Sequence, residues 1–122
     1  VPSDEEFIEL EMYLGMDSTI SKNTGWRGTL EGGKLKESRT IHWNPPNTGA
    51  TNYFGFNAHP SGYRGETGIF TGKGFSCTFL TSSEYNSSST WVRKLYYLNS
   101  TINRSILNKG VSASIRCVRS VL

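Results

Sequence analysis

The sequence predicts an α+β domain, with a helix at the start, long loops in the middle and an antiparallel sheet at the end. Three observations lead to this prediction. A helix-capping pattern opens the chain, turn-forming residues crowd its middle, and strand-forming runs fill its last third. The chain has 122 residues, the usual size of one domain, so we expect residues 1–122 to form a single domain around one core.

The first element is a helix in the segment PSDEEFIELEMYLGM. Ser3 is a good N-cap, and Glu6 three residues later completes a capping box. Gly15 is a natural C-terminal stop. The acidic residues of the first turn favour the positive end of the helix dipole, so they indicate a helix end rather than a catalytic carboxylate pair. Apolar residues share one face at helical spacing, namely Phe7, Leu10 and Leu14.

The middle of the chain, residues 17–72, is rich in turn signals. NTGW, EGGK, NPPNTG, HPSG and YRGETG recur at short intervals and leave little room for long elements. Long loops without regular structure are uncommon in compact domains and are often functional. We interpret the spaced apolar residues of this region as anchors that hold the loops to the core: Trp26, Leu30, Leu35, Trp43, Phe54 and Phe56.

The last third of the chain predicts an antiparallel meander. GFSCTFLTSS, TWVRKLYYLN, STINRSIL and GVSASIRCVRSV are β-rich runs separated by polar breaks. One of them has apolar side chains on both faces, because Trp91 and Leu95 share one face while Val92 and Tyr96 share the other. Taken alone, this pattern indicates a strand that is buried on both sides.

Composition excludes several classes of function. The formal net charge is +3, and no acidic residue follows Glu84. The chain has no recognised nucleic-acid motif, so we expect no nucleic-acid partner. It has no run of about eighteen apolar residues, so we expect no direct membrane insertion. The opening VPSDEEFIEL is not a signal peptide. We therefore expect the C-terminal part of a longer chain, exported through an upstream signal or domain.

The two cysteines, Cys77 and Cys117, leave three alternatives open. They could form one disulfide in an oxidising compartment. Either could instead be buried and free, or be paired with a cysteine upstream. Their spacing is not a zinc motif, because a zinc site needs pairs of ligands.

Metal and phosphate sites find little support. His42 and His59 form no ligand spacing with a cysteine or glutamate that we recognise. Calcium needs several oxygen ligands, and a site through Asp17 or Glu66 has no further support. GETGIFTGKG lacks the closing Gly-Lys-Ser/Thr of a phosphate-binding loop. We therefore predict no metal and no cofactor.

Six strings, in order along the chain, resemble the Fibrobacter succinogenes major paralogous domain family: VPSDEEFIELEMYLG, TGWRGTLEGGKLKE, HWNPPNTGATN, GFNAHPSGYR, TSSEYNSSSTW and SIRCVR. The resemblance implies a C-type lectin-like fold of the formylglycine-generating-enzyme type. It also implies a surface or secreted protein, largely of Bacteroidota-type bacteria. Family members commonly begin earlier, with a cysteine, so the resemblance places the usual partner of Cys117 upstream. They also commonly have FWSSTE where this chain has FLTSSE, so Leu80 replaces a tryptophan.

Enzymatic function is not expected despite the related fold. Formylglycine-generating chemistry needs reactive cysteines, and Cys117 lies in the apolar, strand-like segment SIRCVRSV. A thiol in such a segment is usually inert.

In some members the C-terminal region looks like the target of a diversity-generating retroelement, which changes adenines and so replaces asparagine codons. The segment WVRKLYYLNSTINRSILNK is similar to the unvaried pattern WNRNLNYNNSNVNRNNNNK. Lys94 fits this asparagine pattern less well than the other positions do, because adenine changes in an asparagine codon cannot make lysine. The framework positions are Trp91, Arg93, Leu95, Tyr97, Arg104 and Lys109. The exchangeable, ligand-binding positions are Val92, Lys94, Tyr96, Leu98, Thr101, Asn103, Ser105, Ile106 and Leu107.

Strand geometry agrees with this division, because successive side chains point to opposite faces of a sheet. We expect the framework face to be buried and the other face to carry an exposed apolar patch beside Lys94, made of Val92, Tyr96, Leu98, Ile106 and Leu107. Exposed apolar patches usually mark binding sites. The hypothesis is a non-enzymatic ligand-binding domain of a bacterial surface or pilus-tip adhesin, with a protein or glycan ligand. The alternatives are a structural module of a larger surface protein and a phage receptor-binding protein.

Overall fold

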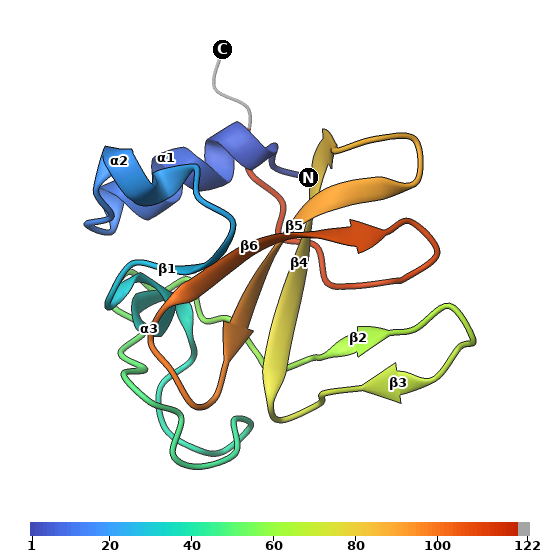
Figure 1. Ribbon diagram of the computed structural model, residues 1–122. Coiled ribbons are helices and arrows are strands. Elements are labelled where there is room, and N and C mark those ends of the chain that lie inside the picture. The colour runs from blue at the N-terminus through green and yellow to red at the C-terminus, as the bar shows by residue number, and fades with distance from the viewer. Residues whose placement is uncertain (120–122) are drawn as a thin grey trace.

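The computed structural model describes residues 1–119 and has the predicted α+β order, with helices first, loops in the middle and a sheet last (Figure 1). The helices are α1 (Asp4–Tyr13), α2 (Ser18–Ser21) and α3 (Glu31–Leu35). Four strands form an antiparallel sheet in the order β1-β6-β5-β4, with bounds Gly25–Arg27, Ile102–Asn108, Ser89–Tyr96 and Ser76–Glu84. A separate hairpin pairs β2 (Tyr63–Arg64) with β3 (Phe70–Thr71).

The capping box at the start of α1 is confirmed. The backbone N–H of Glu6 donates to Ser3 Oγ at 3.1 Å, and Glu6 Oε1 accepts from the backbone N–H of Ser3 at 3.0 Å. Leu14 is the C-cap, and Gly15 follows with a φ of 117°, in the left-handed region that glycine adopts without strain. The helix therefore begins and ends where the sequence predicts.

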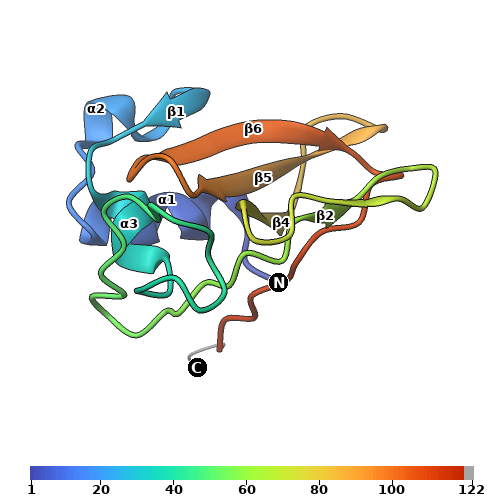
Figure 2. The ribbon, with the colours of Figure 1, turned by 90° about the horizontal axis from the view of Figure 1, so that it is seen from below.

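The sheet has one covered and one helix-free face. In Figure 2, α1 and α3 lie below β5 and β6, α2 lies beside β1 at the left end of the sheet, and no helix is drawn over the upper side of β5 and β6. We call the covered side the inner face and the opposite side the outer face. The core lies on the inner face and contains Phe7, Leu14, Leu35, Trp43, Phe79, Leu95 and Ile102.

Buried charges join α1 to three strands across the inner face. Arg93 of β5 binds two carboxylates of α1, with Nη1 2.6 Å from Asp4 Oδ1 and Nε 2.9 Å from Glu11 Oε2. Nη2 of Arg104 in β6 lies 2.7 Å from Oδ2 of Asp4. Nη2 of Arg27 in β1 lies 2.6 Å from Oε1 of Glu11. All five side chains are buried. Each charge has an opposite partner, which a buried charge requires.

The loop anchors are confirmed only in part. Leu35 and Trp43 are buried in the core, and Phe56 is half-buried against it. The interpretation is wrong for Trp26, Leu30 and Phe54, which are exposed. Trp26 is exposed because it lies on the edge strand β1, opposite Asn103 of β6, and so faces the helix-free side.

The string EGGK forms part of α3 rather than a turn. The reason is close packing of backbone, since a Cβ at Gly32 would overlap the carbonyl oxygen of Thr101 and one at Gly33 would overlap that of Gly49. The glycines therefore let this short helix touch two other segments.

Cys77 and Cys117 are both free, so the disulfide between them is not formed. Cys77 is buried, and burial raises the pKa of its thiol to about 12. Cys117 is exposed in a segment without regular structure, so the expectation of an inert thiol in a strand is wrong. Within residues 1–119, no helix is both long and apolar enough to cross a membrane.

Candidate ligand-binding face

The strand register defines which side chains share the outer face. Arg93 and Leu95 point to α1 and the core, so their neighbours along β5 point the other way. Residues paired across strands share a face, and the outer face therefore consists of cross-strand rows. These rows are Trp26–Asn103–Lys94–Thr78, Ser105–Val92–Leu80, Leu107–Thr90–Glu84 and Tyr96–Ser76.

Most of the predicted exchangeable positions lie on or beside this face. By the register, those on it are Val92, Lys94, Tyr96, Asn103, Ser105 and Leu107. Thr101 precedes β6 and is half-buried, and its hydroxyl donates to Asn99 Oδ1 at 3.1 Å. Leu98 lies in the turn after β5 and is 50% exposed. These side chains therefore extend along β5 and β6, from the β5–β6 turn at Leu98 to Leu107 near the other end of the sheet.

Val92 and Ile106 do not lie where the sequence predicted. Val92 is only 2% exposed, because it stands in the middle of the sheet between Leu80 of β4 and Ser105 of β6. Ile106 pairs with Trp91 and so lies on the inner face, near the sheet's end, where it remains 44% exposed. The expected single patch containing both residues is therefore wrong.

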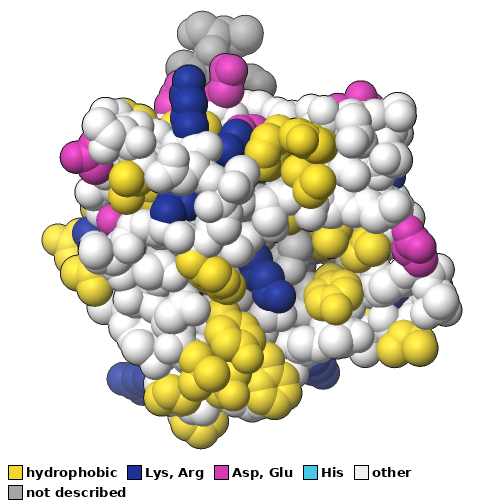
Figure 3. Space-filling view, viewed as in Figure 1, with side chains coloured by type: hydrophobic (Ala, Val, Ile, Leu, Met, Phe, Trp, Pro, Cys, Tyr) yellow, Lys and Arg dark blue, Asp and Glu magenta, His cyan; other side chains and the backbone are white. Residues whose placement is uncertain are grey.

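An aromatic strip replaces the predicted patch. We use this name for Trp26, Tyr96, Tyr97 and Phe75, whose rings contact one another in that order. The ring centroids of Trp26 and Tyr96 are 6.4 Å apart, those of Tyr96 and Tyr97 4.9 Å, and those of Tyr97 and Phe75 5.1 Å. In Figure 3, hydrophobic side chains gather at the lower end of the outer face, over the β5–β6 turn. Trp26 and Phe75 are each 43% exposed, so the strip presents flat apolar surface to solvent.

The backbone beneath the aromatic strip is fixed by hydrogen bonds. Lys36 is fully buried, and its Nζ donates to the carbonyl oxygens of Thr48, Tyr96 and Asn99 at 2.8, 2.9 and 3.0 Å. Burial lowers the pKa of Lys36 to about 8, so the ammonium is charged at pH 7. The carbonyl of Tyr97 accepts from the N–H of Thr48, and its N–H donates to Phe75 O, both at 2.9 Å. These bonds hold the β5–β6 turn against the long loop.

The framework positions divide into buried and surface ones. Arg93, Leu95 and Arg104 are buried on the inner face, as predicted. Trp91 is half-buried there, with the guanidinium carbon of Arg104 3.9 Å from its ring centroid. Tyr97 is half-buried and packs against the core. Lys109 instead lies on the surface, where its Nζ is 2.6 Å from Glu84 Oε1.

Residues 1–119 match the family model of the Fibrobacter succinogenes major domain. The chain belongs to this family. Members are generally domains of surface proteins. No curated relative and no solved structure matches the chain. The finer prediction of a C-type lectin-like fold stays a prediction.

Sequence reasoning missed two residues of the aromatic strip in this Fibrobacter succinogenes major domain. Trp26 and Phe75 lie outside the segment 91–107 that the resemblance singled out. Trp26 reaches the face through the pairing of β1 with β6, which joins residues 26 and 103. Such long-range pairing leaves no local signal. The available signal was the presence of large aromatic residues next to glycine in polar surroundings, in TGWRG and KGFSC.

Proposed function

We propose that this domain is a non-enzymatic binding module of a bacterial surface or pilus-tip adhesin, and that it binds a protein or glycan through the outer face. One observation carries the proposal. Trp26 and Tyr96 of the aromatic strip share one helix-free face with the side chains of Lys94, Asn103 and Ser105, on a backbone that is fixed from behind. Large rings offer contact area at low entropic cost, and neighbouring polar groups offer hydrogen bonds.

The inner face supports the idea that outer-face residues are exchanged by a retroelement. Its buried ion pairs involve Arg93 and Arg104, so side chains at residues 94, 96, 103 and 105 can change without breaking them. A scaffold held in place before binding loses little conformational entropy when a ligand arrives. Diversified binding and a constant fold are therefore compatible in this strand pair.

A direct test compares binding by the wild-type domain with that of Trp26→Ser, Tyr96→Ser and their combination, on glycan and host-protein arrays. Ile106→Ser is the matched control, because it removes an exposed apolar side chain from the inner face. We expect binding to fall at least about tenfold in the double variant, since aromatic anchors typically dominate such interfaces. The control should bind as the wild type does.

A structural module of a larger surface protein is the competing function, favoured by the burial of Val92 and Thr78 on the outer face. Equal binding, or none, by all the folded variants would support this alternative. The retroelement has a separate genomic test. We expect a nearby reverse transcriptase gene and a second copy of the segment encoding residues 85–117 that differs from it at adenines.

A further inference from the structure

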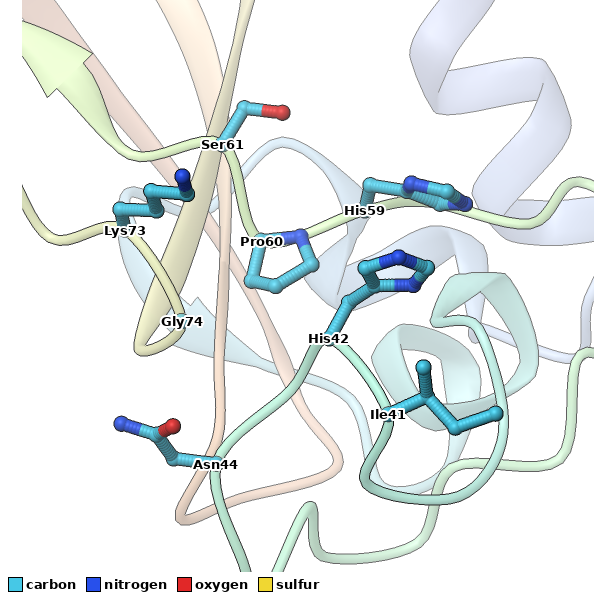
Figure 4. Close-up of a pocket in the computed structure, with 8 residues that line it drawn as sticks. All are labelled: Ile41, His42, Asn44, His59, Pro60, Ser61, Lys73 and Gly74. Carbon is cyan, nitrogen blue, oxygen red and sulfur yellow. The ribbon is translucent and has the colours of Figure 1, made fainter.

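Two histidines and a glutamate that are far apart in the sequence meet on the surface of the long loop. Glu37 is 2.9 Å from His42 Nδ1 through Oε1, and 3.4 Å from His59 Nε2 through Oε2. The two imidazole rings are stacked, with centroids 4.7 Å apart. Figure 4 shows these rings side by side at one end of a pocket, with Lys73 and Asn44 farther away. The cluster lies outside the aromatic strip.

The loop holds these three residues through a shared backbone group. The carbonyl oxygen of Ala58 accepts from the N–H of Glu37 at 3.0 Å and from Trp43 Nε1 at 2.9 Å. His59 directly follows Ala58, and His42 directly precedes Trp43, which is fully buried. All three side chains of the cluster therefore project from segments joined at one point of the core.

A second group fixes the loop between Glu37 and His42. Asn47 is buried, and its Nδ2 donates to the carbonyl oxygens of Glu37 and Arg39 at 2.9 and 2.7 Å. Arg39 has a φ of 71°, a left-handed conformation that is uncommon for a residue other than glycine. The hydrogen bond to its carbonyl holds the turn that carries His42 back towards Glu37.

We propose that Glu37, His42 and His59 bind one divalent transition-metal ion of the zinc class. One ligand atom of each residue lies within 4.8 Å of the other two, and the nitrogens nearest the Glu37 carboxylate are Nδ1 of His42 and Nε2 of His59. In a tetrahedral zinc site with bonds of about 2.0–2.1 Å, ligand atoms lie about 3.3 Å apart. Glu37 Oε2 alone lies 2.9 Å from His42 Nδ1 and 3.4 Å from His59 Nε2, which is close to this spacing, and the rings must bring their nitrogens to the same separation when a metal binds.

The donor set selects the class of ion. Imidazole nitrogen suits zinc, cobalt, nickel and copper, whereas calcium and magnesium prefer oxygen ligands. Three protein ligands leave a fourth position open. That position faces solvent and the adjoining pocket of about 520 Å³, because the histidine side chains are 52% and 47% exposed. A water molecule, or a carboxylate of a partner, would complete the coordination.

Binding replaces interactions that the metal-free cluster makes. Asn57 Nδ2 lies 3.3 Å from His59 Nε2, so this amide must leave the ring nitrogen when a metal takes it. Histidine binds metal in its neutral form, so protons compete with the ion and affinity falls as the pH is lowered. This site could not be predicted from the sequence, because its ligands at residues 37, 42 and 59 do not have the spacing of a known metal motif.

Calorimetric titration with zinc chloride, on the chain carrying Cys117→Ser and no affinity tag, tests the proposal. The substitution removes the one exposed thiol within the described residues. The chain has only two histidines, so no other imidazole competes. We expect saturable binding of one zinc ion per chain, and at least a tenfold loss of affinity in His42→Ala, His59→Ala and Glu37→Gln. Glu66→Gln is the control and should bind as its parent does.

Cobalt supplies an independent readout, because bound cobalt with nitrogen and oxygen ligands absorbs visible light in a way that depends on its geometry. Cobalt should give this absorption with the parent and lose it in His59→Ala. Zinc should also raise the melting temperature of the parent, and a chelator should reverse the rise. The proposal is overturned if the parent shows no saturable binding at 100 μM zinc, or if the histidine variants bind as the parent does.

Discussion

Lys36 is the residue on which the geometry of the outer face most depends. Its ammonium is fully buried and satisfied by three carbonyl groups, two of which belong to residues 96 and 99 at the β5–β6 turn. The ring centroid of Trp43 lies 5.4 Å from Nζ. One cation therefore joins the long loop, the core and the end of the outer face.

Replacing Lys36 by methionine keeps the length of the side chain but leaves three buried carbonyl groups without a donor. We expect the free energy of unfolding to fall by about 2–3 kcal/mol, because unsatisfied buried polar groups cost about 1–3 kcal/mol each and partial relaxation recovers some of it. Urea denaturation measures this change. Lys109→Met removes only a surface ion pair and should change stability by less than about 1 kcal/mol. Similar values for both variants would contradict this account.

The carboxyl group of Asp4 makes the free energy of unfolding depend on pH in the acidic range. Burial alone would raise the pKa of its carboxyl, but hydrogen bonds from Arg104 and Arg93 outweigh burial and hold that pKa below its ordinary value of 3.8. The folded state therefore holds this proton less tightly than the unfolded chain does. The stabilisation is complete above the unfolded pKa and is lost as the pH falls through the folded pKa.

Between pH 7 and pH 5 we thus expect Asp4 to leave the free energy of unfolding unchanged, and below about pH 4 we expect a decline. Urea denaturation across this range measures it. Asp4→Asn should be less stable at pH 7 and should show a shallower decline. An equal decline in the variant would assign the acid sensitivity to other carboxyl groups.

The cysteines respond differently to thiol reagents. Cys117 is exposed, whereas Cys77 is buried and its pKa is raised to about 12, so it carries almost no reactive thiolate at neutral pH. A colorimetric thiol assay should therefore count one fast-reacting thiol in the folded chain and two after denaturation. Fast reaction of the folded Cys117→Ser variant would show that Cys77 is more accessible than the structure indicates.

At the scale of secondary-structure elements, the two faces of β5 differ: one makes buried ion pairs with α1, and the other carries outer-face side chains. Arg93 fixes α1 to the sheet through Asp4 and Glu11, while the next residue, Lys94, projects from the outer face. The ion pairs connect elements that are distant in the chain, and breaking a buried pair leaves an uncompensated charge. Adjacent residues of one strand should therefore tolerate substitution very differently.

Arg93→Met and Lys94→Met make a matched pair on this strand. We expect the first to lower the free energy of unfolding by about 3–5 kcal/mol, because it leaves carboxylates buried without a partner. We expect the second to change it by less than about 0.5 kcal/mol. Chemical denaturation measures both. The division between inner and outer face fails if Lys94→Met is the more destabilising variant.

At the scale of the whole molecule, local sequence patterns predicted the helices and strands. The residues that meet at the outer face and at the histidine cluster depend on the pairing of distant segments. The capping box around Ser3 and the strand alternation around Arg93 are encoded within a few residues, so the helix and the buried framework were predictable. The joining of Trp26 to Asn103 and the meeting of Glu37 with His59 depend on how distant segments pack. Ile106 was misplaced because it was assigned from the asparagine pattern of the resemblance, whereas alternation from Arg104 along the same strand puts it on the inner face.

The burial of Val92 has a consequence for anyone who uses this domain as a scaffold for combinatorial libraries. The codons for residues 94, 96, 103 and 105 could be randomised freely. Library variants with a large or charged side chain at residue 92 would instead fail to fold, because this position is buried. Survivors of a stability screen should be enriched there in valine, isoleucine, threonine and alanine. Natural variants made by a retroelement would also have to fold. The range of residues found at position 92 should therefore be narrower than the template codon permits.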